Sequence, residues 1–138
     1  MKKYFFLLVV LGLSAEGFAQ ATTAKANGPV ITFEKKTHDF GDIYQGDKVE
    51  ETFKFTNTGN EPLVITNVQV TCGCTTPKGW PRDPIAAGGK GEVTIAFNSA
   101  GKMGRQNKVV TIISNATNAD GAQISFTTNV LEKKVNPQ

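Results

Sequence analysis

Residues 49–70 read VEETFKFTNTGNEPLVITNVQV, and this stretch decides the fold. Its first part places Val49, Phe53 and Phe55 on one face and mostly polar side chains on the other, which is the period of a β-strand buried on one side. The cluster NTGNEP at 57–62 is typical of the turn that closes a hairpin. The stretch therefore predicts two consecutive strands joined by a tight connection.

The second strand of this hairpin changes its pattern part-way along. Leu63 and Ile65 share one parity. Val68 and Val70 share the other, so a regular strand would turn half of its apolar side chains to solvent. A β-bulge near Asn67 would return all of them to one face, and we expect one there.

The remaining segments follow the same period of two. Strands are also expected in VITF (30–33), EVTIAFNS (92–99), VVTIISN (109–115) and ISFTTNVLE (124–132). Loops are expected in THDFGDIYQGDK (37–48), TPKGWPRDPIAAGGKG (76–91) and SAGKMGRQNK (99–108). The second of these loops has three prolines and four glycines, a composition that strand interiors exclude.

The whole pattern predicts an all-β fold of about seven short strands without a helical segment. We expect an antiparallel β-sandwich in a single domain over residues 30–133, with a barrel of similar strand number as the alternative. Nine phenylalanines with many valines and isoleucines are enough for a core without disulfide staples. Residues 20–29 are small and turn-prone and are expected to form a linker, and residues 134–138 a tail.

The first residues have the order of a secretory signal peptide. Two lysines precede an apolar run over 4–13, and small residues then flank a cleavage position after Ala19 or Ala21. The run is too short to span a bilayer, so residues 1–19 are expected to be removed, with a retained anchor as the alternative. We therefore expect an exported protein, periplasmic or extracellular, that does not insert into a membrane after cleavage.

The net charge of the mature chain and the compartment expected after export limit the classes of partner and the chemistry of the two cysteines. Removal of residues 1–19 takes away two lysines and one glutamate, which lowers the formal net charge from +3 to +2. Such a weak charge gives no reason to expect a nucleic-acid partner. An oxidising compartment allows disulfides to persist, whereas the same two cysteines in the cytosol would favour metal or redox duty.

The sequence carries no recognisable catalytic set. His38 is the only histidine, and its neighbour Asp39 would point to the opposite face of a strand, so the two do not form an acid–base pair. The glycines of GGKGE at 88–92 lack the spacing and the following helix of a phosphate-binding loop. We expect a protein that is not an enzyme and has no cofactor, with His38 an ordinary surface or loop residue; a hydrolase that uses His38 is the weakest alternative.

The triplet Cys72-Gly73-Cys74 holds both cysteines and leaves three states open. In an extended strand the two Cβ atoms would lie roughly 6–7 Å apart, from two rises of about 3.3 Å each. A disulfide needs about 3.8 Å, so it would require a turn that Gly73 can provide through backbone angles other residues avoid. The alternatives are two packed or semi-exposed thiols, or a two-sulfur site for a soft metal.

A disulfide in this triplet would be a poor structural staple. It encloses almost no chain, so its entropic contribution to stability is small. So small a ring would be strained, and strained disulfides are the easily reduced ones. A closed structural zinc site is not expected, because two cysteines and one histidine do not supply four ligands.

Several motifs together resemble a known family. They are HDFG (38–41), the pattern F-x-F-x-N-x-G-x-x-P-L-x-I that begins at Phe53, the Cys-Gly-Cys triplet, and P-I-x-x-G-x-x-G that begins at Pro84. The sequence from Phe33 to Asn115 resembles a bacterial family of exported proteins, number 1573 among the numbered domains of unknown function. Short forms of this family that begin with a signal peptide are typical of Bacteroidetes. That family is similar to immunoglobulin-like modules of the Hydin and major-sperm-protein kind.

The resemblance implies a seven-stranded immunoglobulin-like sandwich and a role in protein interaction, and it supplies no catalytic residues. Trp80 is expected to cover the Cys-Gly-Cys turn or to cap the core. The leading hypothesis is an exported, non-enzymatic module that binds another protein or an envelope component through an exposed sheet edge. The alternative is a thiol redox or soft-metal module that uses Cys72, Gly73 and Cys74.

Overall fold

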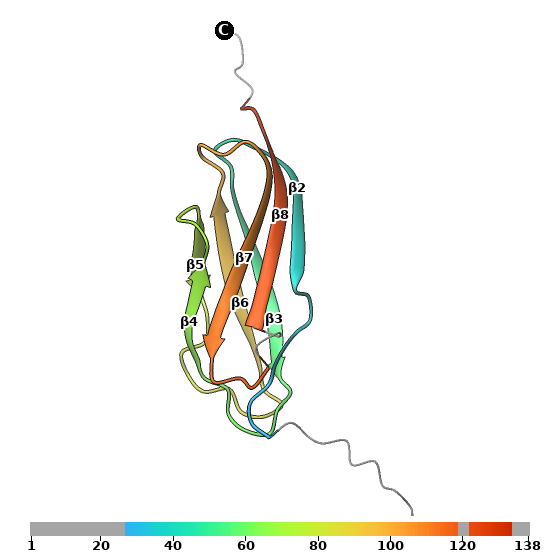
Figure 1. Ribbon diagram of the computed structural model, residues 1–138, viewed down its shortest axis with the longest axis vertical. Coiled ribbons are helices and arrows are strands. Elements are labelled where there is room, and N and C mark those ends of the chain that lie inside the picture. Colours follow the sequence, from blue (N-terminus) through green and yellow to red (C-terminus); the bar gives the residue numbers. More distant parts are fainter. Residues whose placement is uncertain (1–26, 119–121, 134–138) are drawn as a thin grey trace, which may run out of the picture.

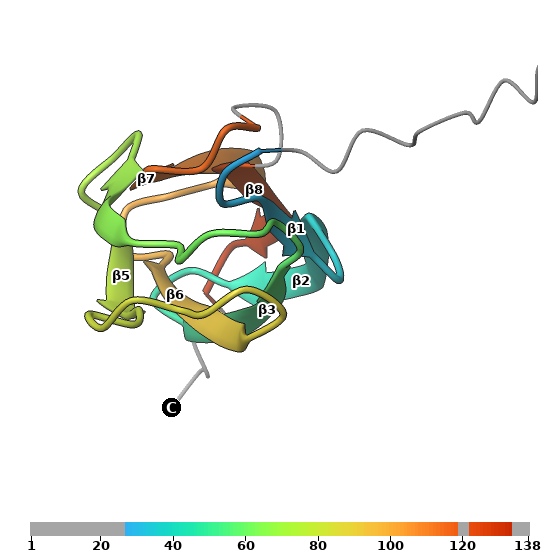
Figure 2. The same ribbon diagram turned by 90° about the horizontal axis from the view of Figure 1, so that it is seen from below.

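The computed structural model describes residues 27–118 and 122–133 and shows two β-sheets packed face to face (Figure 1). Seen end-on, the sheets form two layers with the core between them (Figure 2). The expected signal peptide over 1–19, most of the linker at 20–29 and the tail at 134–138 lie outside the described residues.

Each sheet has four strands. Sheet A has the order β1 (Ile31–Phe33), β3 (Lys48–Asn57), β6 (Lys90–Asn98) and β5 (Thr75–Gly79). Sheet B has the order β2 (Thr37–Tyr44), β8 (Gln123–Leu131), β7 (Gly104–Ser114) and β4 (Ile65–Val70). The predicted single-domain sandwich is confirmed, and its topology places β1, β5, β2 and β4 at the sheet edges.

Segments predicted as loops form two of the strands, β2 and β5, and lengthen a third, β7, so the structure has eight strands where about seven were expected. β2 occupies most of 37–48 and pairs with β8 in parallel, so the sandwich is not wholly antiparallel. β5 occupies the start of 76–91, where Pro77 is accommodated because edge strands tolerate a missing N–H. β7 already begins at Gly104, within the expected connection.

The core is built from the alternating apolar positions of both sheets. The ring centroids of Phe97 and Phe126, one from each sheet, lie 5.3 Å apart and join the two layers. Burial of each phenylalanine contributes about 2–3 kcal/mol. The predicted bulge is confirmed, since the register between β4 and β7 shifts between Ile65 and Asn67. The largest fully buried side chains include Phe53, Phe55, Phe97, Phe126, Leu63, Ile95, Ile112 and Ile124.

Asn57 organises the loops at one end of the sandwich. Its side chain is fully buried, and its carboxamide oxygen accepts hydrogen bonds from the amides of Val30 (3.3 Å) and Gly59 (3.1 Å). Its amide nitrogen donates to the carbonyls of Glu61 (2.8 Å) and Ile85 (2.9 Å). One buried residue thus satisfies four backbone groups from three different loops, which explains its place in the sequence motif.

The motif glycines are also explained by packing and backbone conformation. A Cβ atom on Gly59 would collide with the carbonyl of Gly28, and one on Gly91 would lie 2.5 Å from the ring of Phe55. Gly88 has φ of +79°, in the left-handed region that favours glycine. These parts of the motif are therefore requirements of the fold.

Candidate functional site

The Cys-Gly-Cys triplet forms the connection between the sheets, from the end of β4 to the start of β5. A disulfide joins Cys72 to Cys74, whose Cα atoms are 5.4 Å apart. The Thr75 amide donates a 3.2 Å hydrogen bond to the Cys72 carbonyl and closes the turn. Both cysteines are half-buried. This is the oxidised pair among the three states that the sequence left open.

Gly73 does not have the role that the sequence suggested. Its φ lies outside the left-handed region, and a Cβ atom built on it would meet nothing within 4 Å. The turn therefore does not depend on glycine's conformational freedom. Unlike Gly59, Gly88 and Gly91, Gly73 is not required by the fold.

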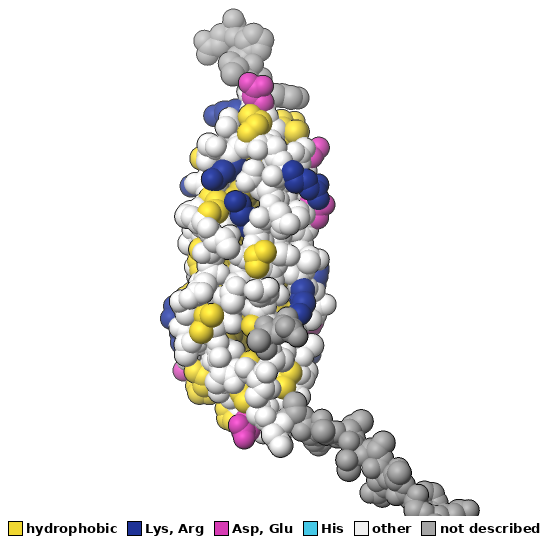
Figure 3. Space-filling model, in the orientation of Figure 1, with side chains coloured by type: hydrophobic (Ala, Val, Ile, Leu, Met, Phe, Trp, Pro, Cys, Tyr) yellow, Lys and Arg dark blue, Asp and Glu magenta, His cyan; other side chains and the backbone are white. Residues whose placement is uncertain are grey.

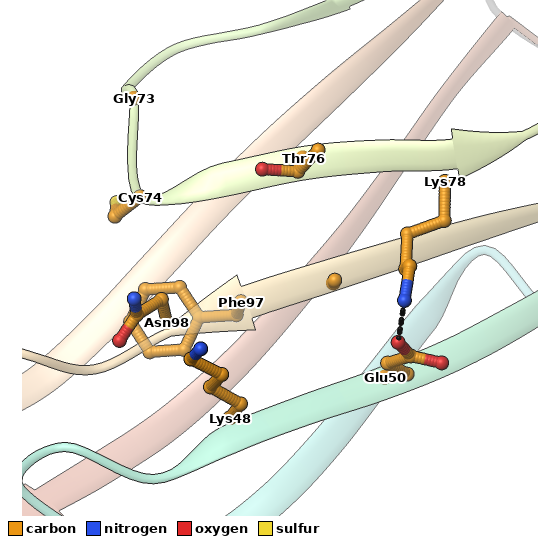
Figure 4. A pocket seen from close by; sticks show the side chains of 9 residues that line it. Lys48, Glu50, Gly73, Cys74, Thr76, Lys78, Phe97 and Asn98 are labelled. Atoms are coloured by element: carbon orange, nitrogen blue, oxygen red, sulfur yellow. Dashed lines mark hydrogen bonds and ion pairs between the residues drawn. The ribbon is translucent and has the colours of Figure 1, made fainter.

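A hollow of about 390 Å³ lies beside Cys74 on the outer face of sheet A. Figure 4 shows Gly73 and Cys74 at one end, with Lys48 and Asn98 close by. At the other end the Lys78 ammonium pairs with the Glu50 carboxylate at 2.7 Å. The hollow is lined by Lys48, Glu50, Gly73, Cys74, Thr76, Lys78, Ala96, Phe97 and Asn98.

Trp80 lies beyond the opposite end of β5 from the disulfide. The six residue steps from Cys74 to Trp80 correspond to about 20 Å in an extended chain, so Trp80 does not cover the cysteine turn. Its ring is partly buried against the core, which agrees with the other expected position, as a cap on the core. The Arg82 guanidinium stacks on the ring at 3.8 Å, and the buried indole Nε1 has no hydrogen-bond partner among the described residues.

His38 is not a loop residue, as the sequence suggested, but a half-buried residue of β2. Its Nε2 lies 3.5 Å from the Glu51 carboxylate, and its Nδ1 lies 3.0 Å from the Lys35 ammonium. The same ammonium pairs with Glu51 at 3.2 Å, and the edge of the imidazole packs against the Phe40 ring. Glu51 and Lys35 were missed because Glu51 has the parity of the buried residues of β3, which the sequence pattern assigns to apolar side chains.

Asp39, the sequence neighbour of His38, has different contacts from His38. Its carboxylate accepts a 2.9 Å hydrogen bond from the Gly41 amide. This bond lowers the pKa of Asp39 below its ordinary value, because it stabilises the ionised form. The bond belongs to the bulge of β2 and gives no acid–base pair with His38. Over residues 27–118 and 122–133, no three His, Cys, Asp or Glu side chains are grouped so that they could hold a metal ion.

One edge of β3 has no strand partner over part of its length. β1 pairs with β3 only at residues 55–57, and the last hydrogen bond on that side runs from the Glu34 amide to the Lys54 carbonyl. On the other side, the Asn57 amide donates to Gly89 next to β6. Because successive residues of a strand point alternately, the backbone groups of Lys48, Glu50 and Thr52 face this side, where they pair with no strand among residues 27–118 and 122–133. We call this segment the open edge of β3.

A second hollow of about 390 Å³ lies at the Thr52 end of the open edge, and it is lined by Glu34, Lys35, Glu51, Thr52, Phe53 and Lys54. Two other sheet edges are blunted. The outer side of β1 is covered by Asn118, whose carboxamide exchanges two hydrogen bonds with the backbone of Ile31 (3.0 and 2.7 Å). β5 contains Pro77 and a register shift, both of which discourage strand pairing.

The arrangement of motifs and strands agrees with one known family. A family model described as "Protein of unknown function (DUF1573)" matches residues 31–130. The chain belongs to this family. No match to the chain is found among curated proteins.

Solved structures show the same fold. A protein of unknown function from Porphyromonas gingivalis W83 has a TM-score of 0.63 and 21% identity over 76% of this chain and 48% of its own. The chain therefore corresponds to about half of that protein. The ASH/PapD-like domain 7 of human CEP192 has a TM-score of 0.55 and 12% identity, over 75% of this chain and 87% of its own. The secreted serine protease VesC from Vibrio cholerae has a TM-score of 0.53 and 16% identity, over 78% of this chain and 24% of its own.

In the described part of the chain, no helix has the length and apolar character needed to cross a bilayer. Figure 3 shows hydrophobic side chains scattered among polar ones over the face of β7 and β8. Single exposed apolar residues of this kind do not mark an interface. The large ones that the structure exposes are Tyr44, Met103, Val109 and Ile113.

Proposed function

We propose that this protein is an exported, non-enzymatic binding module that pairs with an extended segment of a partner protein at the open edge of β3. The observation that carries the proposal is the row of unpaired amides and carbonyls at Lys48, Glu50 and Thr52. Backbone groups at a sheet edge are a template for an added strand, which gains one or two hydrogen bonds per residue pair.

The surroundings favour such an added strand over a random contact. The hollow along the edge has space for side chains of the partner. Its walls carry the exposed charges of Glu34, Lys35 and Lys54, so charged side chains on the partner strand would set its register and direction. The immunoglobulin-like fold and the family membership agree with a binding role but name no partner.

Two variants of Glu50 separate backbone pairing from side-chain contacts. Glu50→Ala removes the exposed ion pair with Lys78 and keeps the N–H, whereas Glu50→Pro removes both. The N–H of Glu50 faces the open edge and not β6, so its loss leaves the β3–β6 ladder intact. A protein captured from extracts of the native host should bind the wild type and Glu50→Ala alike, and lose most of its binding to Glu50→Pro.

Thermal unfolding of both variants provides the control, since a proline that unfolds the domain would abolish binding for another reason. Equal binding by wild type and a folded Glu50→Pro would contradict strand addition at this edge.

Export rests on the first 19 residues, with their two lysines and apolar run. The test is the intact mass of the protein recovered from the native host and the fraction in which it is found. Export is supported if the protein is found outside the cytosol and its mass corresponds to a chain that begins after Ala19 or Ala21. A full-length cytosolic protein would contradict it.

A further inference from the structure

The Cys72–Cys74 disulfide is unusual in lacking any structural task that the fold explains. It closes a loop of sequence separation 2, and a loop this short constrains the unfolded chain little. Neither cysteine is among the fully buried side chains of the core, although Cys74 packs against the core as a partly buried residue. Both cysteines are only half-buried, and the hollow beside Cys74 connects the disulfide with solvent. Exposed disulfides are the labile, regulatory or catalytic ones.

The two sulfur atoms are not equivalent. Cys74 lines the hollow on the outer face of sheet A, whereas Cys72 is not among its lining residues. A reagent that enters the hollow therefore reaches the Sγ of Cys74 first. Lys48 stands in the same hollow and has no ion pair within the described chain, so its ammonium is available to attract an incoming thiolate.

A hydroxyl is placed to receive the other sulfur. Thr75 is 3% exposed, and its Oγ1 lies 3.7 Å from the Sγ of Cys72 and 4.0 Å from that of Cys74. When Cys72 leaves as a thiolate, the Thr75 hydroxyl can donate a hydrogen bond to it. A hydrogen bond to the charged form stabilises a thiolate and makes it a better leaving group.

We propose that Cys72–Cys74 is a thiol–disulfide exchange site that accepts two electrons from a dithiol of a partner protein. A thiolate of the partner attacks Cys74 Sγ, the Cys72–Cys74 bond breaks, and Cys72 leaves as a thiolate. The second thiolate of the partner then attacks the partner's first sulfur, which is bonded to Cys74 in the mixed disulfide, and Cys74 is released as a thiolate. The partner dithiol is oxidised to a disulfide, the two cysteines are reduced, and the two protons of the dithiol end on the released thiols.

The hollow shares Lys48 and Glu50 with the open edge of β3. Exchange is measured at the sulfurs of Cys72 and Cys74, whereas strand pairing is measured at the backbone of β3, so the two proposals can fail separately. The hydrogen bonds of the β3–β6 and β5–β6 ladders are formed by backbone groups and not by the sulfurs. We therefore expect the reduced protein to remain folded, as an exchange site requires.

Two single-cysteine variants test which sulfur is attacked. Cys72→Ser leaves only the thiol of Cys74, and Cys74→Ser leaves only that of Cys72. Under native conditions an aromatic disulfide reagent should modify the Cys74 thiol about tenfold faster, as expected for the sulfur that faces the hollow. Equal rates, or a faster reaction at Cys72, would overturn the assignment of Cys74 as the sulfur that is attacked.

Reduction of the native protein by dithiothreitol tests the site as a whole. Timed alkylation and intact mass give the rate. The disulfide should be reduced without unfolding, and Thr75→Val should slow the reaction about tenfold whereas Thr75→Ser restores it. Near-ultraviolet circular dichroism shows whether each protein is folded during the reaction. Reduction that occurs only in denaturant, or a Thr75→Val variant as fast as the wild type, would overturn the proposal.

Discussion

Replacement of both cysteines by serine is the perturbation whose cost the structure bounds most closely. The disulfide closes a loop of sequence separation 2, that is, of the residues Cys72, Gly73 and Cys74. The chain-entropy relation gives about 1.6 kcal/mol at 25 °C for a loop of this size, compared with about 3 kcal/mol for a loop of 15 residues. Both side chains are half-buried and Cys74 packs against the core, so the substitution to serine adds a small cost from lost burial.

The double variant should therefore remain folded, with a free energy of unfolding about 1–2 kcal/mol lower and a Tm about 6–10 °C lower than the wild type. Guanidinium titration and calorimetry measure both values, and the wild type with its disulfide reduced and alkylated provides a second comparison. A loss above about 4 kcal/mol, or a variant that does not fold, would show that the disulfide is a structural staple and would refute the reasoning.

Four further substitutions test the structural account. Asn57→Ala removes the side-chain hydrogen bonds of four backbone groups, of which the Ile85 carbonyl keeps the Leu63 amide as a donor, and should lower the free energy of unfolding by about 3 kcal/mol, measured by denaturant titration. Gly91→Ala should cost about 1–3 kcal/mol through overpacking, whereas Gly73→Ala should change stability by less than about 0.5 kcal/mol; equal effects would contradict the contacts described. The lowered pKa of Asp39 means that its carboxylate stabilises the fold above its unfolded-state pKa and that this stabilisation is lost as the pH falls through the folded-state pKa. Asp39→Asn should therefore be less stable than the wild type at neutral pH, and the difference should disappear in acid; a difference independent of pH would contradict a role for the hydrogen bond from Gly41.

The sequence was sufficient for the fold class because Phe53 and Phe55, and the apolar residues of the later strands, alternate with polar ones. It was not sufficient for β2 and β5. β2 is interrupted by Gly41 with φ of +71° and a register shift, and β5 contains Pro77, so composition made both segments look like loops. Their pairing with β8 and β6 is a tertiary effect that local patterns do not contain.

The candidate sites were also only partly predictable from the sequence. Cys72 and Cys74 were visible as a motif, but the state of the pair, the hollow beside Cys74 and the contact with Thr75 come from the packing of β5 on β6. The open edge of β3 could not be predicted at all. It exists because the chain leaves sheet A after β1 and enters sheet B at β2, and nothing in the composition of 34–36 shows where that change of sheet occurs.

Residue-resolved amide hydrogen exchange along β3 is the most direct test of the central claim, that the open edge receives a partner strand. In the free protein the amides of Glu50 and Thr52 should exchange rapidly, while those of Glu51 and Phe53, which point to β6, should be protected. In the complex with a captured partner, Glu50 and Thr52 should become protected as well. Amides of Glu50 and Thr52 that are already protected in the free protein, or that still exchange rapidly in the complex, would contradict it.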